Sequence, residues 1–144
     1  MQIRRMSEKD IDAVAELEKK IFSSPWSKES IQKAFSLNEN IYLVAEEKNE
    51  IVGYCGIWTS FETADLCNIA VHPEWRRRGI ADEVLAEAFR LCRKSQVEQL
   101  LLEVRESNNG AIALYKKNGF VSIDVRKAYY KSPIENAIIM QLKL

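Results

Sequence analysis

Glycine, proline and cysteine are all scarce in this sequence, and each shortage excludes a class of protein. Its 144 residues include 5 Gly, 3 Pro and 3 Cys. So little glycine and proline argues against a disordered or collagen-like chain. Three cysteines without a CxxC pair make both a disulfide framework and a thiolate zinc site unexpected. Cys55, Cys67 and Cys92 are therefore expected to pack as small apolar groups, and no metal is expected.

Long apolar runs and an excess of either charge are also missing. No stretch approaches the roughly 20 apolar residues that span a bilayer, and Met1–Arg5 lacks the apolar segment of a secretory signal. The 21 basic and 21 acidic side chains cancel, which weakens the case for a nucleic-acid binder that acts through net charge. We therefore expect a cytoplasmic protein with no membrane partner and no direct binding of nucleic acid.

The spacing of apolar residues predicts one α/β domain over residues 1–144, without repeats or linkers. Apolar runs predict strands over 2–6, 41–46, 51–59, 64–71, 100–104, 120–126 and 137–143. Helical spacing predicts helices over 8–22, after Ser27, from Ile80 to Cys92 and over 111–118. The continuous run 100–104 is typical of a central strand that is covered on both faces. This order implies a mixed sheet with helices on both faces.

The segment 69–82 carries the strongest chemical pattern. A predicted strand leads into a short loop in which Gly79 stands at the start of a helix. The first N–H groups of a helix lack internal partners and lie at the positive end of its dipole, so this turn suits a pyrophosphate. Arg76–Arg78 add donors and positive charge. A solvated arginine run is the first alternative. The second is RNA binding, in which these arginines act with Arg90, Arg93 and Lys94.

The same turn resembles the pyrophosphate-binding signature of the GNAT acetyltransferases. Arg76-Arg77-Arg78-Gly79-Ile80-Ala81 follows the pattern Q/R-x-x-G-x-G/A, between a strand and a helix as in that family. Ala81 is the less frequent residue at its position and leaves slightly less room for phosphates. Other segments resemble the bacterial RimI-type branch, which acetylates the N-terminal alanine of a small-subunit ribosomal protein. They are Ser24–Ser27, Asn68–Val71, Leu102–Asn108, Ala113–Tyr115, Gly119–Phe120, Tyr129-Tyr130 and Asn136–Met140.

This resemblance, which covers essentially the whole chain, implies the GNAT fold and acetyl-CoA as cosubstrate. The fold is a mixed, mostly antiparallel sheet of about six to seven strands, with about four helices on its two faces and splayed central strands. The backbone of Ile69, Ala70 and Val71 would hold the pantetheine arm between the strands 64–71 and 99–105, with an N–H group near the thioester carbonyl. The remaining cofactor-binding residues implied are Arg76, Arg77, Arg78, Gly79, Ile80, Ala81, Asp82 and Asn108.

Glu103 and Tyr115 are the catalytic residues that the resemblance implies. Glu103 would accept the proton of the attacking amine through water, and its place inside an apolar strand predicts a partial burial that suits this task. Tyr115 would donate a proton to the departing thiolate, since a phenol with a pKa of about 10 is protonated at neutral pH. From the residues alone, Glu103 could instead pair with Arg105, and Tyr115 could be a core tyrosine.

The same resemblance implies an acceptor side. Trp26 and Glu29, near the second helix, and Tyr129 and Tyr130, before the last strand, would flank the entrance for a peptide. The aromatic side chains could instead simply cover the end of the sheet. The implied function is acetyl transfer to the N-terminal amine of a protein, with a ribosomal protein as the partner. The alternatives are an acetyltransferase for a small amine and a non-catalytic CoA-binding or ribosome-binding module.

Overall fold

Seven strands and four α-helices follow one another in the predicted order in the computed structural model, which describes all residues, 1–144. The strands are β1 (Gln2–Arg5), β2 (Ile41–Glu47), β3 (Glu50–Ser60), β4 (Thr63–Val71), β5 (Gln99–Arg105), β6 (Val121–Lys131) and β7 (Ile134–Lys143). The α-helices are α1 (Ile11–Ile21), α2 (Lys28–Phe35), α3 (Ile80–Lys94) and α4 (Asn109–Lys117). The largest difference from the prediction is that β6 and β7 extend towards each other as one long hairpin.

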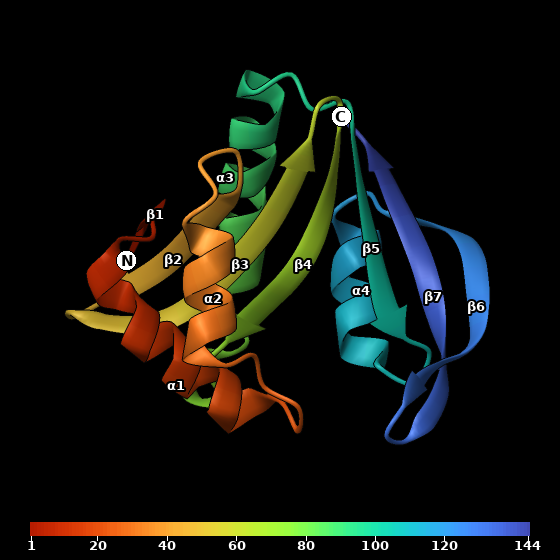
Figure 1. The fold of residues 1–144 in the computed structure, drawn as a ribbon, viewed down its shortest axis with the longest axis horizontal. Coiled ribbons are helices and arrows are strands. Elements are labelled where there is room, and N and C mark those ends of the chain that lie inside the picture. Colours follow the sequence, from red (N-terminus) through yellow and green to blue (C-terminus); the bar gives the residue numbers. More distant parts are fainter.

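All seven strands belong to one sheet, in the order β1-β2-β3-β4-β5-β7-β6. Neighbouring strands are antiparallel except β4 and β5, which are parallel. β4 and β5 pair only between Thr63–Asp65 and Gln99–Leu101 and then separate (Figure 1). We call this separation, between Leu66–Val71 of β4 and Leu102–Arg105 of β5, the split. The predicted mixed, mostly antiparallel sheet with splayed central strands is therefore confirmed.

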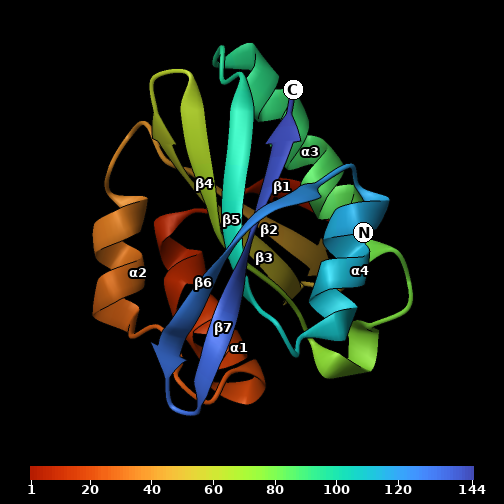
Figure 2. The same ribbon diagram turned by 90° about the vertical axis from the view of Figure 1, so that its right-hand side faces the viewer.

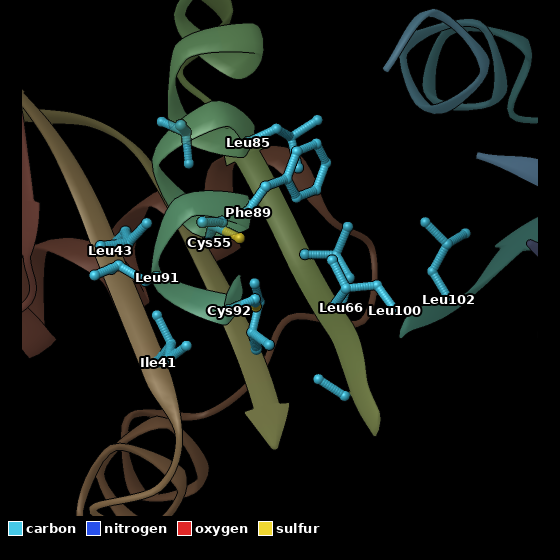
Figure 3. Close-up of a cluster of buried hydrophobic side chains, with 14 of the residues drawn as sticks. Ile41, Leu43, Cys55, Leu66, Leu85, Phe89, Leu91, Cys92, Leu100 and Leu102 are labelled. Atoms are coloured by element: carbon cyan, nitrogen blue, oxygen red, sulfur yellow. The ribbon is translucent and has the colours of Figure 1, made fainter. Parts of the chain in front are cut away.

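The helices cover the two faces of the sheet over different strands. α1 and α2 pack on one face of β2, β3 and β4, around buried residues such as Val14, Ile31 and Val44. α3 packs on the opposite face, where its Leu85 and Phe89 lie over the sheet (Figure 3). α4 lies on the same side as α3 (Figure 2) and next to β5 (Figure 1). None of these helices has the length and apolar character that crossing a membrane requires.

The structure corrects the expectation that the run 100–104 is covered on both faces. Leu100, Leu102 and Val104 are buried towards α3 and α4, whereas Glu103 points to the other face and is exposed. That face of β5 has no helix over it, because the cluster under α1 and α2 takes in residues of β2, β3 and β4 only. The sequence pattern shows that a strand is apolar, but not how far sideways a distant helix extends.

The start of α1 is tied to β1 through the buried Asp10. Arg4 donates hydrogen bonds of 2.8 and 3.0 Å to its two carboxylate oxygens, and the N–H and hydroxyl of Ser7 donate two more. The Arg4 bond is the largest cause that lowers the pKa of Asp10 from 3.8 to about 2. A lowered pKa means that the folded chain favours the ionised form. The stability from Asp10 is therefore present above its ordinary pKa and is lost as the pH falls through about 2.

We expect Asp10→Asn to lower the free energy of unfolding at neutral pH by roughly 2 kcal/mol. Urea unfolding of both chains between about pH 7 and about pH 2 measures this. The wild-type chain should lose this contribution between about pH 4 and about pH 2, and the variant should lack that loss. If both chains lose the same stability over that range, Asp10 does not carry it.

Candidate active site

The split leaves one edge of β4 without a neighbouring strand. Beyond Asp65, β4 remains paired with β3 as far as Val71 but no longer with β5, which pairs with β7 along its length. The backbone groups of Leu66–Val71 on that edge therefore have no strand partner. Unpaired strand groups of this kind can bind the amide groups of an extended ligand. The predicted residues Ile69, Ala70 and Val71 all lie on this edge.

The turn before α3 has the geometry of an anion site. Gly79 is the N-cap residue with φ +75°, and no side chain caps the helix. The first intrahelical bond joins the Glu83 N–H to the Gly79 carbonyl, so the N–H groups of Ile80, Ala81 and Asp82 have no partner within the helix. A Cβ at residue 79 would meet no atom within 4 Å, so this side of the turn is open. These features fit a pyrophosphate.

The three arginines before Gly79 differ in their contacts. Arg76 donates to the Val71 carbonyl at 3.2 Å and ties the turn to the end of β4. The Arg78 guanidinium lies 4.6 Å from the centre of the Trp75 ring, a cation–π contact. Arg77 is exposed, with φ +65° and no hydrogen bond from its side chain within the chain. Arg76 and Arg78 thus each make a contact within the chain, whereas Arg77 makes none and its guanidinium is available to an anion.

Two of the predicted cofactor residues use their side chains within the protein. The Asp82 carboxylate accepts hydrogen bonds of 2.9 Å from both Lys117 and Asn118, which joins the start of α3 to the end of α4. Asn108 Oδ1 accepts from the Ala111 N–H at 3.2 Å and caps α4. Asp82 therefore offers a ligand its backbone N–H and not its carboxylate. A contact between Asn108 and the cofactor stays a prediction.

Glu103 lies on the face of β5 that no helix covers. Its side chain is exposed, so the partial burial expected from the sequence is wrong. The alternative pairing with Arg105 is also absent, because Arg105 binds Glu135 at 3.1 Å and lies 4.2 Å from the centre of the Tyr130 ring. The Glu103 carboxylate forms no ion pair and is free to accept a proton.

Acidic and aromatic side chains lie close to Glu103. Partial burial and then the Glu103 charge raise the pKa of Asp65 on β4, so these two carboxylates influence each other across the split. The interaction with Glu103 is the largest cause that raises the pKa of Tyr129. Burial and then the Asp65 charge raise the pKa of Cys67 to about 12. The Glu103 carboxylate, which interacts with the Tyr129 hydroxyl but with no cation, can take a proton from an amine, directly or through water.

Tyr115 projects from α4, on the opposite side of the sheet from Glu103. It is 8% exposed and packs edge-on against Phe120, with 5.7 Å between ring centres. Its hydroxyl has no partner within the chain, yet no side-chain oxygen is both sealed from solvent and unpartnered. The hydroxyl is therefore accessible although the ring is packed. Burial raises the pKa of Tyr115, so the phenol stays protonated and can donate.

The aromatic residues predicted for the acceptor side form two pairs. Trp26, before α2, packs edge-on against Trp58 of β3 with 5.5 Å between ring centres. Tyr129 and Tyr130 pack edge-on at 5.1 Å, where an irregularity interrupts the pairing of β6 with β7. Glu29 is exposed in the first turn of α2. The roles of Trp26, Glu29, Tyr129 and Tyr130 stay predictions.

The site predicted from the sequence does not include three residues that lie in this region: Asp65, Trp58 and Glu18. Asp65 alternates with buried residues of β4, and Trp58 is its partner in the register of β3 and β4. Period-two alternation could have placed both on the face of the sheet opposite α3. Glu18 is completely buried on α1. Its spacing of four residues from the apolar Val14 was a signal of burial, but a charged residue in a helix is usually solvated.

The cysteine thiols of the core are not set up as nucleophiles. No group of three or more His, Cys, Asp or Glu side chains could hold a metal ion. Cys55 and Cys92 are buried in the core, where burial raises the pKa of Cys55 and raises that of Cys92 to about 11. These thiols stay protonated at neutral pH, so they are poor nucleophiles.

Comparison with known proteins extends over nearly the whole chain. The acetyltransferase (GNAT) family matches residues 11–120. A Bacillus subtilis (strain 168) protein, provisionally named ribosomal protein bS18-alanine N-acetyltransferase, is 40% identical over 139 residues, which are 96% of this chain and 92% of the relative. The ribosomal protein bS18-alanine N-acetyltransferase of Haemophilus ducreyi is 34% identical over 148 residues, 99% of each chain.

Solved structures agree with the sequence comparison. The crystal structure of the ribosomal-protein-S18-alanine N-acetyltransferase from Escherichia coli matches with a TM-score of 0.91 and 29% identity, over 99% of this chain and 92% of that one. The family match covers more than half of the chain, and the relatives match from end to end. Together with the split sheet and the glycine turn, these similarities show that the chain belongs to the GNAT family of acetyltransferases.

Proposed function

We propose that this chain is a single domain, residues 1–144, that transfers the acetyl group of acetyl-CoA to the N-terminal α-amine of a protein in the cytoplasm. The acceptor proposed is the N-terminal alanine of ribosomal protein bS18, for which the relatives are named. The observation that carries the proposal is the placement of Glu103 and Tyr115 on opposite sides of the sheet beside the split, with the turn before α3 following the end of β4.

The proposal gives each part of the site a role in binding acetyl-CoA. The N–H groups of Ile80, Ala81 and Asp82, with the Arg77 guanidinium, would bind the diphosphate. The free edge of β4 at Ile69–Val71 would bind the amide groups of the pantetheine arm. When bound, acetyl-CoA supplies an activated acyl group. The chain's own residues orient it and move the protons.

An α-amine demands less of a base than a lysine does. Its pKa is about 7.7–8.0 against about 10.4 for lysine, so roughly a tenth is already neutral at pH 7. The Glu103 carboxylate takes the proton of the amine, directly or through water, as the nitrogen bonds to the acyl carbon. The Tyr115 phenol donates its proton to the departing sulfur. A thioester and an N–H bond break, and an amide and a thiol form. Exchange with water then removes the proton from Glu103 and returns one to Tyr115.

If the turn before α3 binds the diphosphate, a Cβ added at residue 79 should weaken the binding of CoA. An alanine held at φ +75° lies in the left-handed region, which costs about 1–2 kcal/mol, and its Cβ enters the open side of the turn. We expect Gly79→Ala to weaken CoA binding about tenfold or more, while the melting temperature falls by only a few degrees. Isothermal titration calorimetry with CoA measures this. An unchanged dissociation constant would place the diphosphate elsewhere.

Mass spectrometry of acetylated products tests the proposed acceptor. The purified chain is given isotope-labelled acetyl-CoA and a peptide that starts with alanine and contains an internal lysine. The same peptide with a blocked N-terminus and a free polyamine serve as competing acceptors. We expect the label on the terminal nitrogen of the alanine only. Label on the polyamine or on lysine would favour a small-amine or lysine acetyltransferase, and no label on any acceptor would favour a non-catalytic module.

A further inference from the structure

Glu18 is the one buried carboxylate without a cationic partner. It is completely buried on α1, and the only other buried charged residue is Asp10, which binds Arg4. Three neutral groups donate to Glu18 instead. The backbone N–H of Trp26 donates at 2.9 Å and the Asn68 side-chain amide at 2.6 Å, and the Tyr54 hydroxyl is the third donor. We call these four residues the Glu18 network.

An apolar residue at position 18 would complete the core under α1 without the free energy that burying a carboxylate costs. Taking a carboxylate out of water costs several kcal/mol, and neutral donors only partly offset this. Burial and then the Glu18 charge raise the pKa of Tyr54, so its hydroxyl stays a donor to Glu18. The network therefore needs an explanation other than stability, and the places where its donors lie supply one.

One arm of the Glu18 network reaches the strand that borders the split. The register of β3 and β4 shifts because Gly56 faces Asn68 while Ile57 faces Leu66, which leaves Cys67 as an extra residue in β4. This bulge reverses the alternation, so that Leu66 packs towards α3 whereas Asn68 points to α1 and Glu18. The Asn68–Glu18 bond therefore fixes β4 directly before Ile69–Val71.

The other arm reaches the acceptor side. The backbone N–H of Trp26 donates to Glu18, which fixes the backbone from which the Trp26 ring packs against Trp58. Trp58 is fixed in turn, since its indole N–H donates to the Tyr42 hydroxyl at 2.9 Å. One buried carboxylate thus joins the segment that presents Trp26 to the strand that borders the split.

We propose that Glu18 is a positioning residue for acetyl transfer, which holds the acceptor-side Trp26 and the β4 strand of the cofactor site in fixed relation. This inference rests on the proposed function. Glu18 itself contacts neither substrate. Its removal should therefore weaken both sites together, whereas a local change at either site should weaken that site alone.

Glu18→Ala and Asn68→Asp test this, with Asp10→Asn as the matched control. Glu18→Ala removes the acceptor of the Trp26 backbone N–H and of the Tyr54 hydroxyl and one of the two acceptors of the Asn68 amide, which keeps its 2.9 Å bond to the Tyr54 oxygen. Asn68→Asp sets a second carboxylate against Glu18. We expect each to raise the KM for an alanine-starting peptide and the Kd for CoA by about threefold or more, and to lower kcat/KM about tenfold. Asp10→Asn also removes the hydrogen bonds of a buried carboxylate, but it should change these constants less than about twofold at a temperature where all chains are folded.

A reciprocal exchange tests the network itself. In the double variant Glu18→Gln with Asn68→Asp, the glutamine oxygen accepts from the Trp26 N–H, and its amide donates to the new carboxylate, which also accepts from Tyr54. We expect kcat/KM to recover to within about threefold of the wild-type value. Should either single variant fold too poorly to assay, Tyr54→Phe removes one donor without a change of charge and should move the same two constants in the same direction.

The outcomes separate this inference from the proposed function. If Glu18→Ala changes the peptide KM but not the Kd for CoA, Glu18 does not hold the two sites in fixed relation. If Asp10→Asn loses as much activity, Glu18 is merely structural. If the wild-type chain binds CoA but does not acetylate the peptide, the proposed acceptor is wrong. In that case the comparison of the Kd for CoA between the Glu18→Ala and Asp10→Asn variants still decides whether Glu18 acts on the cofactor site.

Discussion

Replacing Glu103 by glutamine should lower kcat for an alanine-starting peptide about 100-fold at neutral pH. The amide keeps the shape of the side chain but cannot take the proton of the amine. Because Glu103 is exposed and forms no ion pair, the substitution leaves no buried group without a partner, and the melting temperature should not change. Roughly a tenth of an α-amine is neutral at pH 7 without help, so the deficit should narrow as the pH rises past the pKa of the amine.

Profiles of kcat against pH at saturating acetyl-CoA measure this effect for the wild-type chain and the variant. Glu106→Gln is the matched control, because Glu106 is also exposed, lies just beyond the end of β5 and undergoes the same change of charge. We expect the control to keep the wild-type rate. If Glu103→Gln and Glu106→Gln behave alike, the proton of the amine leaves by another route.

Replacing Tyr115 by phenylalanine should lower kcat about 100-fold or more, with little change in the affinity for CoA. The ring keeps its contact with Phe120, and the lost hydroxyl has no partner within the chain, so the fold loses no hydrogen bond. Without the phenol, the sulfur of CoA must leave as an unprotonated thiolate. Single-turnover kinetics together with calorimetry separates the chemical step from binding.

The pH dependence provides a second test of Tyr115. The protonated phenol is the active form, and burial raises its pKa above the ordinary value of 10.0. Activity should therefore rise with pH as the amine loses its proton and then stay level to at least about pH 10. A decline of the wild-type rate that begins near pH 8, or a full rate in the phenylalanine variant, would rule out Tyr115 as the acid.

The order of the elements and the glycine turn could be predicted from the sequence. Apolar spacing predicts a helix from Ile80 to Cys92, and the structure has α3 over Ile80–Lys94 with Gly79 directly before it, as expected. The left-handed conformation of Gly79 is seen only in the structure. The split could be predicted only from the resemblance to the family. The point at which β4 and β5 stop pairing, at Asp65, depends on contacts between strands that lie far apart in the sequence. Periodicity describes each element, not where two elements part.

The environment of the proposed catalytic base could not be predicted. Leu100–Val104 is apolar enough to suggest burial on both faces, yet the open face of β5 holds Glu103 because α1 and α2 cover β2–β4 only. Burial of Glu18 was also missed, since its partners Tyr54 and Asn68 lie 36 and 50 residues away along the chain. The bulge at Cys67 that turns Asn68 towards Glu18 has no local sequence signal.

A crystal structure of this chain with CoA tests the central claim most directly, because the claim is that the split and the turn before α3 form the cosubstrate site. We predict diphosphate oxygens within hydrogen-bond distance of the N–H groups of Ile80 and Ala81, and the pantetheine arm along Ile69–Val71. The sulfur should lie between Glu103 and the Tyr115 hydroxyl. CoA bound on another surface, with the split closed by its own side chains, would contradict the account.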